Sequence, residues 1–114
     1  MAYKAKQGDI IWLSLDPQSG HEQKGRRPAL VISNDVFNEF AISGALVCPI
    51  SSVDRRNPLQ PSLDSRTKTQ GVIMCDQVKA LDIVAREASF IERVPYEILA
   101  NVINIVCRIL EIVD

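Results

Sequence analysis

Short apolar segments follow one another along most of this 114-residue chain, and they leave little room for long helices between them. They are rich in β-branched residues and are separated by glycine, proline, asparagine or aspartate, a pattern typical of β-strands. The expected strands are 10–15, 28–33, 45–50, 72–75, 78–84 and 88–94. Because strands that follow one another at short spacing tend to pair antiparallel, we expect a mainly β (α+β) domain. Its small antiparallel sheet or barrel should be strongly curved.

Three details of this pattern lead to local expectations. The first strand, 10–15, is almost continuously apolar, which predicts burial on both faces. Pro28 should open the second strand, where its missing N–H costs no ladder hydrogen bond. The segment 53–62 combines two prolines with charged and polar residues, and this composition indicates an exposed loop.

Two helices are expected. Asn34 can cap a short helix of one or two turns over 36–40. Pro95 suits the first position of a C-terminal helix, and Glu97 lies in its first turn, where negative charge is favourable. The apolar residues of that helix recur at helical spacing. They are Ile98, Leu99, Val102, Ile103, Val106, Ile109 and Leu110, and Ile105 widens the stripe enough to suggest a second packing partner.

The composition is that of one globular domain over residues 1–114, with 46% hydrophobic and 24% charged residues. A net charge of −1 excludes a basic surface over the whole molecule, so any nucleic-acid site must be a local patch. Cys48, Cys75 and Cys107 lie in apolar runs without CxxC spacing, which favours three reduced core thiols in a cytosolic protein. One histidine cannot complete the common zinc patterns, so no metal or other cofactor is expected. The N-terminus is unlike a signal peptide, and no run approaches the ~18 apolar residues that span a bilayer.

A polar segment from Gly20 to Pro28 connects the first two expected strands. It gathers the only histidine, a carboxylate, an amide and three cations: His21, Glu22, Gln23, Lys24, Arg26 and Arg27. Loops that concentrate polar chemistry in this way often bind a ligand. A solvated hairpin loop with chance charges would have the same composition.

Two strand ends carry further polar pairs, Ser51-Ser52 and Asp76-Gln77. If these ends meet the polar segment at one edge of the sheet, Arg27 can hold a phosphate in its planar fork, and Ser51 can bond a phosphate oxygen. His21 titrates near neutrality and can move a proton.

Carboxylates and further cations complete the set. Glu22 or Asp76 can orient His21 or act as base, while Lys24 and Arg26 add positive potential for a polyanion. Such groups can break an RNA strand without a metal, by attack of the 2′-OH on its own phosphate. Ordinary turns and surface charges explain the same residues, and spacing alone leaves both interpretations open.

The motifs in their order resemble the MazF/PemK (Kid-like) family of toxin endoribonucleases. The matching stretches are Gly8-Asp9-Ile10-Ile11-Trp12, Leu15-Asp16-Pro17, Gly20 to Val31, Val47 to Ser52, and Gly71 to Lys79. The resemblance extends over essentially the whole chain. It implies an SH3-like barrel with a C-terminal helix, assembled as a homodimer, in the bacterial cytoplasm. It also implies metal-independent, sequence-specific cleavage of single-stranded RNA to 2′,3′-cyclic phosphate and 5′-OH ends, and a cognate antitoxin with an acidic flexible tail.

The resemblance also implies a set of site residues. The family's arginine before proline falls on Arg27, its threonine or serine on Ser51 and the Kid-like histidine on His21, which makes these three the expected catalytic residues. Met74 stands where the Kid-like branch has an arginine, and a thioether cannot transfer a proton, so Arg27 with Ser51 forms the expected catalytic core. The remaining candidates are RNA-binding or accessory residues: Glu22, Gln23, Lys24, Arg26, Ser52, Arg55, Asp76, Gln77 and Lys79.

Two other functions compete with a ribonuclease. Toxins of the same fold also bind DNA gyrase without catalysis, and that function has no need of the polar segment. A plain RNA-binding module would bind with strong salt dependence and cleave nothing.

Overall fold

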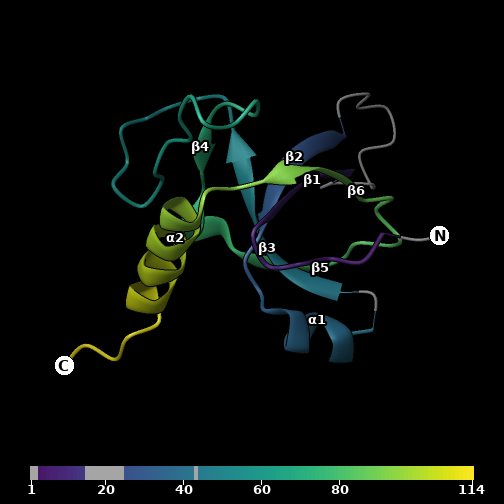
Figure 1. Cartoon of the computed structure of the whole chain (residues 1–114). Coiled ribbons are helices and arrows are strands. Elements are labelled where there is room, and N and C mark those ends of the chain that lie inside the picture. The colour runs from purple at the N-terminus through teal and green to yellow at the C-terminus, as the bar shows by residue number, and fades with distance from the viewer. Residues whose placement is uncertain (1–2, 15–24, 43) are drawn as a thin grey trace.

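The computed structural model describes residues 3–14, 25–42 and 44–114, and in these residues an antiparallel six-stranded sheet is combined with two α-helices (Figure 1). The elements in chain order are β1 Asp9–Ser14, β2 Arg26–Val31, α1 Asp35–Phe40, β3 Gly44–Ser51, β4 Val72–Ile73, the 3-10 turn η1 Cys75–Gln77, β5 Lys79–Asp82, β6 Ser89–Arg93 and α2 Tyr96–Ile109.

Strand β3 is the centre of the sheet, whose order is β4-β3-β2-β1-β6. One edge of β3 pairs with β2, while its other edge pairs first with β5 (Gly44 to Val47) and then with β4 (Ile50 and Ser51). Among the described strands β6 pairs only with β1, so the sheet is strongly curved but not closed. The predicted curved antiparallel sheet is therefore confirmed in its open form.

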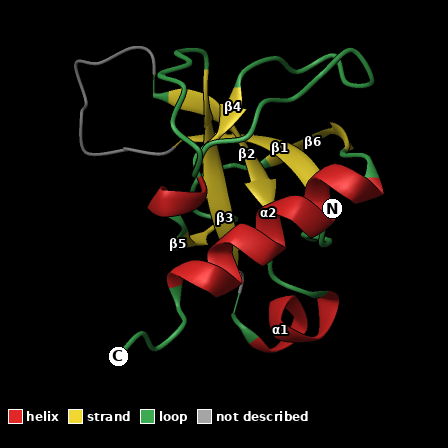
Figure 2. Ribbon diagram, turned by 90° about the vertical axis from the view of Figure 1, so that its left-hand side faces the viewer, coloured by secondary structure: helices red, strands yellow, loops and turns green. Residues whose placement is uncertain are grey.

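Alternating side chains of the sheet build two hydrophobic cores. One core lies between the sheet and α2, which crosses this face in Figure 2. It includes Ile10, Leu30, Cys48, Ile73 and Val102. The other core fills the opposite face and includes Ile11, Leu13, Val31, Val47 and Leu81. Burial of β1 on both faces is thereby confirmed for Ile10, Ile11 and Leu13, whereas Trp12 is exposed.

Both predicted helices are present. Asn34 caps α1 as expected, since its side-chain oxygen accepts a hydrogen bond from the Phe37 N–H at 2.8 Å. Pro95 is the N-cap of α2 rather than its first helical residue, so the helix begins one residue later than predicted. Only part of the predicted apolar stripe is buried, because Ile109 and Leu110 lie exposed at the end of the helix.

Two strand predictions were wrong in detail. Pro28 lies inside β2 rather than at its start, opposite Trp12 of β1. It is tolerated there because β2 pairs with β3 only from Ala29 onward, so one edge of β2 is unpaired at Pro28. The strand expected over 72–75 ends at Ile73, and the chain turns into η1 after Met74, whose N–H donates to the Pro49 carbonyl at 2.8 Å.

The cysteine prediction holds for two residues of three. Cys48 and Cys75 are buried, whereas Cys107 is exposed on α2. The hydrogen bond with the Cys75 sulfur, together with burial, raises the pKa of the Cys48 thiol well above its usual range, so it stays protonated. No helix in the described ranges has the length and apolar character needed to cross a bilayer.

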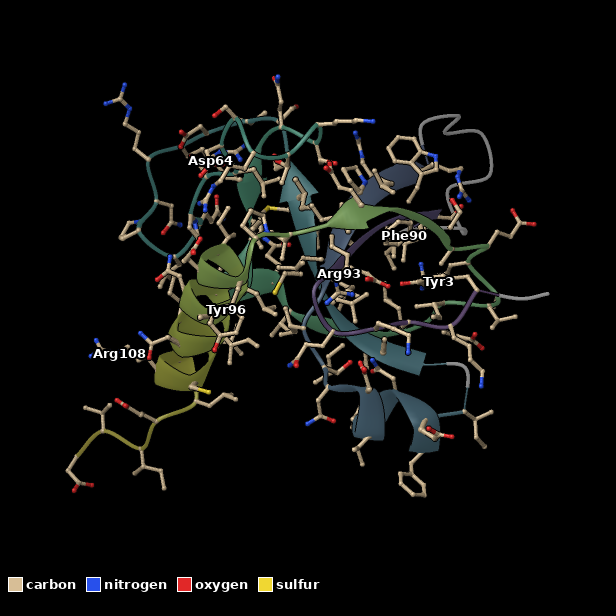
Figure 3. All side chains as sticks on the ribbon, in the orientation of Figure 1. Tyr3, Asp64, Phe90, Arg93, Tyr96 and Arg108 are labelled. Carbon is tan, nitrogen blue, oxygen red and sulfur yellow. The ribbon has the colours of Figure 1, made fainter. Side chains whose placement is uncertain are left out.

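Side-chain contacts tie the N-terminal segment to β6 (Figure 3). The buried Asp9 carboxylate accepts a hydrogen bond from the Tyr3 hydroxyl and one from the Arg93 guanidinium, the latter at 2.8 Å. Burial and the bond to Asp9 raise the pKa of Tyr3, so its hydroxyl remains a donor. The contact stabilises the start of β1, which ends at the candidate site.

Candidate active site

Four strand ends meet at one end of the sheet, the upper end in Figure 1. Ser14, the last residue of β1, pairs with Arg26, the first residue of β2. Ser51, the last residue of β3, pairs with Val72, the first residue of β4. Ser51 therefore lies at the same end of the sheet as the start of β2, whereas the predicted polar pair Asp76-Gln77 follows the opposite end of β4.

Arg27 and Ser51 occupy matching positions on neighbouring strands. The last paired residues of β2 and β3 are Ala29 and Pro49. Arg27, near the start of β2, and Ser51, at the end of β3, each lie two residues beyond this last pair. The Arg27 side chain is exposed and forms no hydrogen bond or ion pair with any other described residue. Its five N–H donors are available to an anion.

Close packing fixes the backbone at Ser51. Its hydroxyl accepts a hydrogen bond from the Val53 N–H at 3.0 Å, which leaves the hydroxyl proton to donate elsewhere. Gly71 lies against the Ser51 carbonyl at a φ of +129°, and a Cβ at Gly71 would lie less than 3.0 Å from that oxygen. Only glycine fits this conformation, so Gly71 determines where β4 meets Ser51.

Arg26 is arranged differently from its neighbour Arg27. Its guanidinium donates to the backbone carbonyls of Trp12 at 3.0 Å and Glu87 at 2.9 Å. These bonds join the start of β2 to β1 and to the turn before β6. The Arg26 guanidinium thus stabilises the fold through these hydrogen bonds, although the sequence suggested that it contacts the substrate.

Asp76 and Gln77 lie exposed on η1, directly after β4. Asp76 Oδ1 accepts a hydrogen bond from the side-chain amide of Gln60 at 3.1 Å. Gln60 belongs to the predicted loop 53–62, which is exposed through most of its length but buries this one side chain. Gln60 was not identified from the sequence. Its only sign in the sequence is that a polar residue stands between Leu59 and Pro61, close to the apolar segments that form the strands.

The remaining candidates divide by location. Ser52 and Arg55 are exposed just beyond Ser51, near the candidate site. Lys79 lies opposite Val47, four positions before Ser51 on β3, which is about 13 Å along the strand. His21, Glu22, Gln23 and Lys24 lie outside the described residues. In the described ranges no three histidine, cysteine, aspartate or glutamate side chains are grouped to hold a metal ion.

Comparison with known proteins identifies a family for nearly the whole chain. The sequence model described as "PemK-like, MazF-like toxin of type II toxin-antitoxin system" matches residues 6–110. Endoribonuclease PemK of Escherichia coli is 37% identical over 109 residues, which cover 92% of this chain and 81% of that protein. Endoribonuclease toxin MazF of Escherichia coli K12 is 35% identical over 88 residues, 76% of this chain and 77% of that protein.

Solved structures agree with the sequence relatives. A crystal structure of MazE-MazF from Deinococcus radiodurans superposes with a TM-score of 0.86 at 33% identity, covering 95% of this chain and 96% of that one. MazF alone from the same organism gives a TM-score of 0.83 at 33% identity, covering 95% and 97%. The family match, the identities and the shared fold together show that this chain belongs to the PemK-like, MazF-like toxins of type II toxin-antitoxin systems.

Proposed function

We propose that this chain is a toxin endoribonuclease that cleaves single-stranded RNA at specific sequences without a metal ion. The observation that carries the proposal is that Arg27 and Ser51 lie on neighbouring strands, each two residues beyond the last β2–β3 pair, and that the Arg27 side chain has no hydrogen bond or ion pair among the described residues. The relatives named endoribonuclease PemK and MazF support the same activity. The gyrase-binding alternative has no comparable support, since the relatives named above are endoribonucleases.

The cleavage follows from the chemistry of these side chains. The ribose 2′-OH attacks the adjacent phosphorus, the O2′–P bond forms, and the P–O5′ bond breaks. A base takes the 2′ proton and an acid protonates the leaving 5′ oxygen, which yields a 2′,3′-cyclic phosphate and a 5′-OH. Arg27 would hold the nonbridging oxygens in its fork as charge develops on them, and the Ser51 hydroxyl would donate to one of these oxygens.

Proton transfer is assigned to the remaining ionisable groups. Asp76 lies beyond the β4 end, two residues after Met74, which has no proton to give. We assign acid-base or orienting roles to His21 and Asp76. Glu22, Gln23, Lys24, Ser52, Arg55, Gln77 and Lys79 are proposed as RNA contacts.

A direct assay tests this proposal. Purified protein in excess chelator should cut a defined single-stranded RNA at reproducible positions and leave 5′-OH ends that a polynucleotide kinase can label without prior phosphatase treatment. Intact RNA at high protein concentration would contradict it. Growth arrest with intact transcripts would instead indicate a toxin that acts through protein contacts, and salt-sensitive binding without turnover would indicate an RNA-binding module.

Neutralisation by an antitoxin completes the proposal. The MazE-MazF structures of Deinococcus radiodurans are complexes between members of such a pair. We propose that a cognate antitoxin of this chain lays a flexible acidic segment over the Arg27 site, where its carboxylates compete with phosphate. The proposed place of action is the bacterial cytoplasm, since the curated relatives come from bacteria.

We further propose a homodimer. The apolar stripe of α2 is wider than the sheet covers, and Tyr96, Ile109 and Leu110 remain exposed along it. A second copy can bury this surface without loss of solubility. Light scattering at micromolar concentration should give twice the chain mass of 12.7 kDa, and a stable monomer would contradict the proposal.

A further inference from the structure

A buried amide donates a hydrogen bond to Asp76, one of the proposed site residues. The Gln60 side chain is only 8% exposed, and its Nε2 donates to Asp76 Oδ1 at 3.1 Å. Its Oε1 is buried and has no hydrogen-bond partner within the described residues. A buried acceptor without a partner costs stability, because it has lost its hydrogen bonds to water. An apolar side chain of the same length would avoid this loss of folding stability.

The backbone on both sides of Gln60 is fixed to the segment that carries Asp76. The Cys75 N–H donates to the Leu59 carbonyl at 3.2 Å, and the Ile73 N–H donates to the Pro61 carbonyl at 2.9 Å. The Gln60 N–H itself donates to the Asn57 carbonyl at 2.9 Å. These bonds leave the Gln60 side chain little freedom, so one oxygen of the Asp76 carboxylate is held in a set direction. The exposure of Asp76 leaves the carboxylate accessible from solvent.

We propose that Gln60 is a positioning residue, which orients the Asp76 carboxylate toward the RNA and thereby couples the loop 53–62 to catalysis. This inference rests on the proposed ribonuclease function. A neutral amide suits the task, because it restricts the carboxylate without cancelling its charge as a lysine or arginine would. The unpaired Oε1 is then a stability cost that is retained for activity.

The first test replaces Gln60 by an apolar residue of similar length. Gln60→Met should leave the melting temperature unchanged or higher, since it removes the unpaired acceptor. It should lower kcat on a defined single-stranded RNA by about fivefold to tenfold, with a smaller change in KM, because a hydrogen bond to a charged group is lost. In an Asp76→Asn background the same replacement should have no further effect on kcat. An unchanged kcat, or an undiminished effect in that background, would overturn the inference.

A second variant separates positioning from general loop support. Asn57 accepts a hydrogen bond from the Leu59 N–H at 2.8 Å and so holds the same loop without touching Asp76. If Asn57→Ala reproduces the full loss of kcat seen with Gln60→Met, loop anchoring explains the effect and the inference fails. A markedly smaller loss supports it.

The pH profile gives an independent measurement. In Gln60→Glu the introduced carboxylate faces Asp76, and repulsion between like charges should displace it at neutral pH. As the pH falls, the introduced carboxyl takes up a proton and can donate a hydrogen bond to Asp76 again. The ratio of the variant's activity to that of wild type, both measured at the same pH, should therefore rise. For Gln60→Met that ratio should stay flat, and a flat ratio for both variants would contradict the inference. A wild-type chain that cleaves no RNA would refute the proposed function itself, whereas a cleaving wild type with these variants unaffected refutes only the role of Gln60.

Discussion

Arg27→Ala should reduce RNA cleavage by at least about 100-fold while the protein stays folded. The guanidinium is expected to stabilise charge that develops on the phosphate, and preorganised donors of this kind contribute roughly 3 kcal/mol to transition-state stabilisation. The melting temperature should change little, because the exposed Arg27 side chain contacts no partner among the described residues. Single-turnover cleavage of a defined RNA, with circular dichroism of the same sample, measures both quantities.

The matched control for Arg27→Ala is Arg108→Ala. Arg108 lies in the last turn of α2, far from the strand ends of the candidate site (Figure 3). Removing its charge changes the net charge by the same amount, so a purely electrostatic effect of net charge would appear in both variants. Arg27→Lys should recover only part of the activity, since an ammonium keeps the charge but lacks the planar fork. Wild-type cleavage by Arg27→Ala would exclude Arg27 from the chemistry.

Local sequence pattern predicted most of the fold. The apolar β-branched runs became β1, β2, β3 and β6, and Asn34 caps α1 as its side chain and position suggested. The errors occur where distant contacts override local preference. Residues 72–75 have strand composition, yet the bond from the Met74 N–H to Pro49 ends β4 early. Pro28 is acceptable inside β2 only because the pairing of β2 with β3 begins after it, at Ala29. The local sequence pattern does not contain this information.

The sequence suggested residues for the candidate site but not their supporting contacts. The residue types and the family resemblance pointed to Arg27, Ser51 and His21 as catalytic residues and to Asp76 as an accessory one. The sheet places Arg27 and Ser51 near neighbouring strand ends, whereas Asp76 follows the far end of β4 and His21 lies outside the described residues. The same reasoning placed Arg26 with the substrate, although its fork is engaged by backbone carbonyls. Gln60 lies 16 residues from Asp76 in the chain, and only the folded structure reveals their hydrogen bond. Arg26 and Arg27 thus differ in their hydrogen bonds, although they are adjacent and identical in type.

Gly71→Ala should be the most damaging single-methyl change near the site. At a φ of +129° an alanine is strained, and its Cβ would collide with the Ser51 carbonyl oxygen. We expect a loss of about 3 kcal/mol in the free energy of unfolding, which corresponds to a melting temperature lower by about 10 °C or more. Cleavage should also fall by about 100-fold at temperatures where the variant is still folded, because relief of the collision displaces Ser51 from its position at the end of β3.

Gly44→Ala is the control that separates this collision from a general effect of replacing glycine. Gly44 begins β3, and a Cβ there would meet nothing nearer than 3.5 Å, with no positive φ to strain it. Its melting temperature and cleavage rate should stay close to those of wild type. If Gly71→Ala loses stability but cleaves normally while folded, the position of Ser51 is not critical for catalysis. If it also melts like wild type, β4 does not approach Ser51 as closely as the structure requires, and the catalytic end of the sheet must be arranged differently.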